Sequence, residues 1–123
     1  MKFVIGLGIL VAALCTPLLI QWKREQTKER QRVSRILWVM DDLNRRRAGH
    51  EGYHALIRIE ATFQDHGLPR DGIGALLHRM EDRGLIATRI RGKAEYGLRQ
   101  EGVNLLESVR NHPQERTWLP EAP

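Results

Sequence analysis

The sequence predicts a small, mainly α-helical domain with one β-hairpin, preceded by a single transmembrane helix. Three observations support this fold class. Residues 3–20 contain no charged side chain, apolar residues then recur at helical spacing in four segments, and two short alternating runs flank Gly92-Lys93. Of the 123 residues, about 100 follow the apolar segment, which is enough chain for one domain.

The apolar segment is long enough to cross a bilayer. Its 18 residues form a helix of about 27 Å at ~1.5 Å per residue. Trp22, Lys23 and Arg24 follow it, and an aromatic ring next to cations is typical of a membrane interface. We therefore expect an uncleaved anchor over residues 1–22, with the lipid bilayer as a partner. Signal cleavage and lipidation of Cys15 remain the alternatives.

The charges beside this segment predict its orientation. Lys2 is the one charged side chain before it, whereas six cations follow within about 15 residues: Lys23, Arg24, Lys28, Arg30, Arg32 and Arg35. The positive-inside rule then places the N-terminus outside and the following domain in the cytoplasm, on a single-pass protein of the inner membrane. Cys15 is the lone cysteine, so no intramolecular disulfide forms.

The next segments read as a stalk and a first helix. Residues 23–31 are almost wholly polar and contain no Gly or Pro, which favours a solvated helical stalk. From Val33, apolar residues recur at spacings of 3, 1, 3 and 3 and define one helix face. Cations at residues 45–47 and Gly49 predict where this helix ends.

Two further helices follow the same logic. One is expected over residues 52–64, with an apolar face that includes Leu56, Ile57 and Phe63. The next is expected over residues 72–83 and ends at Gly84. Its buried stripe has spacings of 3, 1 and 3 and consists of Ile73, Leu76, Leu77 and Met80.

The C-terminal third supplies the hairpin and a last helix. Residues 85–91 and 94–98 alternate around a Gly-containing turn, which predicts two paired strands. Residues 100–110 carry the final apolar helical pattern, and Pro113 follows it. We expect residues 111–123 to form a flexible tail, within which Trp118 docks on the domain.

The order α-α-α-β-β-α over residues 32–110 is that of a winged helix-turn-helix domain. Three groups of residues resemble the PadR-like regulators: Gly52-Tyr53, the Leu76-Leu77, Met80 and Gly84-Leu85-Ile86 set, and Tyr96, Leu98 and Glu101-Gly102. This resemblance implies a DNA-binding transcriptional regulator that is usually dimeric.

Six side chains are the candidate contacts to nucleic acid. Three lie in or beside the third helix and three in the hairpin: Arg70, His78, Arg79, Arg89, Arg91 and Lys93. The outward positions near the start of the third helix include Gly72, Gly74 and Ala75, whose side chains form no hydrogen bonds. We therefore expect poor sequence-specific reading. The strand cations also fit an ordinary solvated face.

The charge distribution keeps a second hypothesis open. Residues 23–49 hold nine Lys/Arg and four Asp/Glu, whereas residues 50–123 hold ten and eleven, so the basic surplus lies next to the predicted membrane. A membrane-anchored DNA-binding regulator is the leading hypothesis. The alternative is a membrane-tethered module that binds a protein partner, or a second copy of this chain, without sequence-specific DNA binding.

The sequence gives no support for an enzyme. His50 and His54 are four residues apart, but no cysteine or further histidine stands at ligand spacing, so no metal site is expected. No Ser/His/Asp set, Gly-rich phosphate loop or carboxylate pair is placed for catalysis. We expect no cofactor and no small-molecule substrate.

Overall fold

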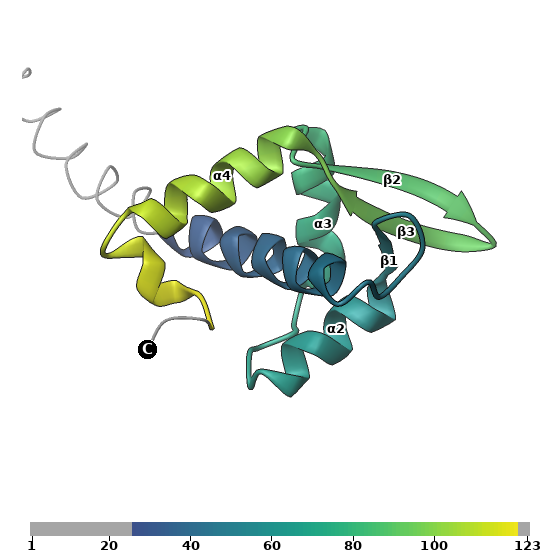
Figure 1. Ribbon diagram of the computed structural model, residues 1–123, viewed down its shortest axis with the longest axis horizontal. Coiled ribbons are helices and arrows are strands. Elements are labelled where there is room, and N and C mark those ends of the chain that lie inside the picture. Colours follow the sequence, from purple (N-terminus) through teal and green to yellow (C-terminus); the bar gives the residue numbers. More distant parts are fainter. Residues whose placement is uncertain (1–25, 121–123) are drawn as a thin grey trace, which may run out of the picture. The chain divides into compact units, whose positions relative to one another are not determined.

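The computed structural model describes residues 26–120. The predicted anchor, with Trp22, Lys23 and Arg24, therefore lies outside the described residues. The chain divides into two compact units, Met1–Arg30 and Gln31–Pro123, and the elements labelled in Figure 1 belong to the second. Within residues 26–120, no helix has the length and apolar character that crossing a bilayer requires.

The prediction of a mainly helical chain with a small antiparallel sheet is confirmed (Figure 1). An N-terminal helix is described over residues 26–45. The labelled elements that follow are β1 (Tyr53–Ala55), α2 (Leu56–Asp65), α3 (Ile73–Asp82), β2 (Ile86–Arg91), β3 (Lys93–Leu98), α4 (Gln100–Asn111) and the 3-10 helix η1 (Glu115–Trp118). The sheet has three strands in the order β1-β3-β2, and both pairs are antiparallel.

Strand β1 is the main departure from the expected elements. The sequence predicts a helix from residue 52, but α2 begins at Leu56 because residues 53–55 pair with β3. Tyr53 lies opposite Gly97, and its ring occupies the space that a side chain at that position would fill. This long-range pairing outweighs the local helical pattern.

The core lies between the N-terminal helix and the three later helices. The expected stripe of α3 is buried in full: Ile73, Leu76, Leu77 and Met80. The N-terminal helix contributes the largest share of apolar side chains, namely Val33, Ile36, Leu37, Trp38, Val39, Met40 and Leu43. Full burial of each large apolar side chain stabilises the fold by roughly 1.5–3 kcal/mol. These helices therefore hold the hairpin in place.

The C-terminal segment includes a short helix that packs against the domain. Residues 115–118 form η1, Leu119 is buried, and Trp118 packs against the core. The Nε of Arg35 donates a hydrogen bond of 3.0 Å to the carbonyl oxygen of Trp118. The expected docking of Trp118 is thus present, and the apolar pair Trp118-Leu119 is the physical reason that the segment is held.

His54 fastens β1 to the N-terminal helix. Its side chain is buried, and Nε2 lies 2.6 Å from Oδ1 of Asn44. Nδ1 has no hydrogen-bond partner in the described part of the chain. A side chain at Gly49, where φ is 78°, would overlap the imidazole, so this turn requires glycine. Burial lowers the pKa of His54, Arg58 lowers it further, and Glu95 opposes both.

Replacing Gly102 tests the packing of α4. Alanine in place of glycine inside a helix normally stabilises by about 1 kcal/mol. Here the added methyl would collide with the carbonyl oxygen of Leu85. We therefore expect Gly102→Ala to lower the free energy of unfolding by about 1–3 kcal/mol in urea titrations followed by circular dichroism. Ser108→Ala, at an exposed position of α4, is the control. Equal stability of the two variants would contradict this packing.

The pKa of His54 predicts a pH dependence of stability. Because its folded-state pKa lies below the unfolded value of about 6.5, the unfolded chain binds the proton more readily. Stability is therefore fully present above about pH 6.5 and is lost as the pH falls below it, by at most about 1.4 kcal/mol per pH unit. In unfolding titrations from pH 7 to pH 5, His54→Gln should flatten this slope. Ser108→Ala, at an exposed position without a titratable side chain, should leave it unchanged.

Candidate nucleic-acid interface

The hairpin formed by β2 and β3 has one charged and one largely apolar face. Its register pairs Arg89 with Glu95 and Arg91 with Lys93, so these four side chains share a face. The alternate pairs, on the opposite face, are Thr88 with Tyr96 and Ile90 with Ala94. Gly92, with a φ of 77°, forms the turn between the strands. The expected basic residues of the hairpin therefore project together.

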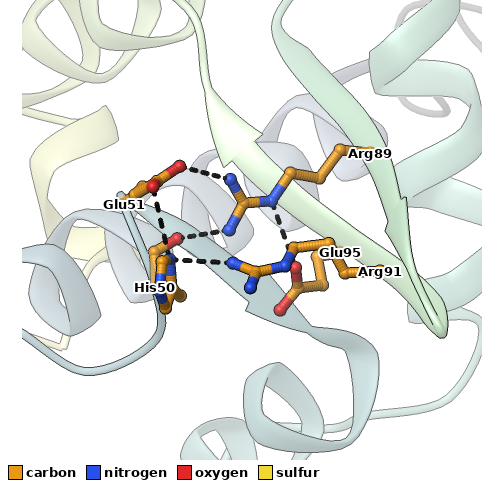
Figure 2. Close-up of polar contacts among 5 residues, drawn as sticks. All are labelled: His50, Glu51, Arg89, Arg91 and Glu95. Atoms are coloured by element: carbon orange, nitrogen blue, oxygen red, sulfur yellow. Dashed lines mark hydrogen bonds and ion pairs between the residues drawn. The ribbon is translucent and has the colours of Figure 1, made fainter.

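Arg89 joins the hairpin to the loop that precedes β1, as Figure 2 shows. Its Nε lies 3.1 Å from Oε1 of Glu95, and its Nη1 lies 2.8 Å from Oε2 of Glu51. Its Nη2 donates to the carbonyl oxygen of His50 at 2.8 Å. The guanidinium carbon also lies 4.1 Å from the ring centre of Tyr53, a cation–π contact. All three guanidinium nitrogens are thus engaged within the protein.

Glu51 lies among three basic side chains. Besides its contact with Arg89, its Oε1 is 3.7 Å from Nδ1 of His50, and that nitrogen is 3.0 Å from Nη1 of Arg91 (Figure 2). The hydrogen bond from Arg89, followed by the positive charges around it, lowers the pKa of the Glu51 carboxyl. The same hydrogen bond raises the pKa of Arg89. We call His50, Glu51, Arg89, Arg91 and Glu95 the hairpin cluster.

The backbone places Glu51 in this position. Its φ is 57°, in the left-handed region that residues other than glycine seldom adopt. Gly49 and Gly52, on either side, also have positive φ values, of 78° and 82°. The loop over residues 48–52 thus turns sharply enough to carry Glu51 back toward the hairpin. It ends where β1 pairs with β3.

Two other candidate cations line a groove beside the hairpin. Arg70 lies in the turn before α3 and Lys93 at the start of β3. The Nη1 of Arg70 donates to Oε1 of Gln64 at 3.0 Å. The remaining lining residues come from the start of α2, the turn and β3: Ala55, Leu56, Ile57, Glu60, Asp71, Gly72, Ala94 and Tyr96. Two carboxylates, Glu60 and Asp71, therefore balance the two cations.

The exposed side of α3 is poorly equipped to bind bases. Ala75 is exposed and carries no polar side-chain atom. His78 is exposed, and its Nε2 lies 3.8 Å from Oδ2 of Asp82. Arg79 is also exposed, in the last turn of the helix. The nearby Glu81 accepts a hydrogen bond of 2.7 Å from the Thr88 hydroxyl. Carboxylates on this surface would repel phosphate groups.

The six predicted contact residues therefore fall into three pairs. Arg89 and Arg91 belong to the hairpin cluster, Arg70 and Lys93 line the groove, and His78 and Arg79 lie on α3. Sequence reasoning did not find the roles of Tyr53, Glu51 or Glu95. The pairing of Glu95 with Arg89 could have been predicted from the sequence, because both residues stand three positions from Gly92, at the turn of the hairpin. No pattern in the sequence predicts the position of Glu51, since that position depends on the pairing of β1 with β3.

Comparisons with known proteins add no relative to this description. No family model, curated protein or solved structure matches the chain.

Proposed function

We propose that this chain is a membrane-anchored winged-helix protein that binds duplex DNA mainly through the phosphate backbone. In this proposal α3 is the recognition helix, the β2–β3 hairpin is the wing, and residues 1–22 hold the protein at the inner membrane with its domain in the cytoplasm. The order of helices and strands and the sequence resemblance to PadR-like regulators support it.

The observation that carries the proposal is the grouping of cations around the hairpin tip. Arg91 and Lys93 are cross-strand neighbours, and both are exposed. Lys93 shares the groove with Arg70, which precedes the start of α3. Cations on a hairpin and beside a helix are suited to neighbouring phosphates of a duplex, and such contacts provide affinity without reading sequence.

The surface of α3 sets the expected specificity. Gly74 and Ala75 offer no hydrogen bond to base edges, and His78 lies near a carboxylate. Glu81 and Asp82 add negative charge on the same helix. We therefore propose that the affinities for unrelated duplexes of equal length differ little, because phosphate contacts dominate binding.

A second candidate function, docking of a protein partner, is favoured by two exposed isoleucines. Ile57 is 72% exposed and Ile90 is 73% exposed. Ile57 lines the groove, and Ile90 pairs across the hairpin with Ala94, which also lines it. Large apolar side chains beside balanced charges are suited to a protein surface better than to DNA.

Salt-dependent DNA binding tests the first candidate. The full chain in detergent micelles should bind a fluorescent duplex at low salt, and the affinity should fall steeply as salt rises. Arg91→Ala and Lys93→Ala should each weaken binding and reduce the slope of log K against log salt by about 0.9. Arg116→Ala removes the same charge from the exposed C-terminal segment and is the control. Absence of binding by the wild type at low salt would exclude this function.

Photo-crosslinking in cells tests the second candidate. A photoreactive amino acid at position 57 should yield a discrete adduct that protease, but not nuclease, degrades. Ile90→Asp should reduce that adduct, because Ile90 pairs across the hairpin with Ala94, which lines the groove together with Ile57. The same probe at Ser108, an exposed position of α4, is the control. Equal crosslinking from positions 57 and 108 would contradict a docking site in the groove.

A further inference from the structure

The carboxylate of Glu51 lies among basic side chains that could instead bind a phosphate group. Its oxygens lie 2.8 Å from Nη1 of Arg89 and 3.7 Å from Nδ1 of His50, with Arg91 bonded to that histidine (Figure 2). We propose that His50, Arg89 and Arg91 form a phosphate-binding site for the DNA backbone, which the Glu51 carboxylate fills in the free protein. This inference rests on the proposed DNA-binding function.

The chemistry of the site is that of phosphate recognition. The planar guanidinium of Arg89 presents N–H groups in fixed directions, and such charged donors bind the oxygens of carboxylates and of phosphates. The ring of Tyr53, 4.1 Å away, holds this group in one orientation. The carbonyl oxygen of His50 and the carboxylate of Glu95 engage Nη2 and Nε, which leaves Nη1 as the nitrogen that Glu51 satisfies. A phosphate oxygen that replaces Glu51 would therefore meet a preoriented donor.

Of the two carboxylates on Arg89, Glu51 is the one that a ligand displaces. The Glu51 side chain is 67% exposed, whereas that of Glu95 is 16% exposed and belongs to β3. Glu51 also has a positive φ of 57° and lies in a loop with Gly49 and Gly52. Ion pairs of exposed carboxylates are weak and screened by salt, so this contact opens readily. Glu95 remains in place and keeps Arg89 on the hairpin.

Displacement occurs by competition and not by protonation. Arg89 and the neighbouring positive charges lower the pKa of Glu51, so the carboxyl stays ionised at neutral pH. A backbone phosphate carries the same charge and exchanges with the carboxylate on the same donors. Glu51 therefore limits the affinity of the hairpin for DNA, and the number of phosphate contacts rises when it leaves.

Glu51→Gln tests this site in the full chain, with the fluorescent duplex used above as the probe. The amide keeps the shape of the side chain and removes its charge. We expect affinity at low salt to rise by about tenfold, and the slope of log K against log salt to steepen by about 0.9, the value for one added phosphate contact. Glu107→Gln is the matched control, because Glu107 also pairs with an arginine, Arg110, at 3.1 Å. It measures the effect of the lost negative charge alone.

Failure of the phosphate site and failure of the proposed DNA-binding function give different results. Absence of wild-type binding at low salt overturns the proposed function. Wild-type binding with equal affinities and slopes for Glu51→Gln and Glu107→Gln overturns the phosphate site and leaves the function standing. Arg89→Lys supplies a second measurement, since lysine keeps the charge but not the fork. In that background, Glu51→Gln should change the affinity by no more than Glu107→Gln does.

Discussion

The pairing of Tyr53–Ala55 with β3 is the interaction on which the rest of the site depends. It determines where α2 begins and directs the loop of residues 48–52 toward the hairpin. It also places the Tyr53 ring against Gly97 and beneath the guanidinium of Arg89. His54, buried between these elements, connects the same strand to Asn44 of the N-terminal helix. The three residues of β1 thus connect the core to the charged face of the hairpin.

Local ion pairing makes the number of basic residues a poor measure of binding capacity in this fold. Arg89 is one of four cations in residues 85–99, yet two carboxylates and a carbonyl oxygen already surround it. Arg91 and Lys93 keep their exposure because they lie at the hairpin tip, where the strands extend beyond β1. The affinity for a polyanion therefore depends on which cations remain accessible, and not on how many the segment contains.

Features set by local spacing could be predicted from the sequence, and those set by distant contacts could not. The stripe of α3 follows from its periodicity, and the hairpin follows from alternation around Gly92. Strand β1 could not be predicted in this way, because its three residues look helical locally and their partners lie forty or more positions later. The position of Glu51 could not be predicted for the same reason. The burial of Leu119 could not be predicted either, because it depends on core residues that are distant in the sequence.

The hydrogen bond between Arg35 and the carbonyl of Trp118 has a consequence for biosynthesis. The two residues are 83 positions apart, so a growing chain makes the N-terminal helix long before the segment that covers part of it. The contacts that Trp118 and Leu119 make with the core therefore form only after these late residues have been synthesised. Completion of the core is therefore a late event in the synthesis of the chain.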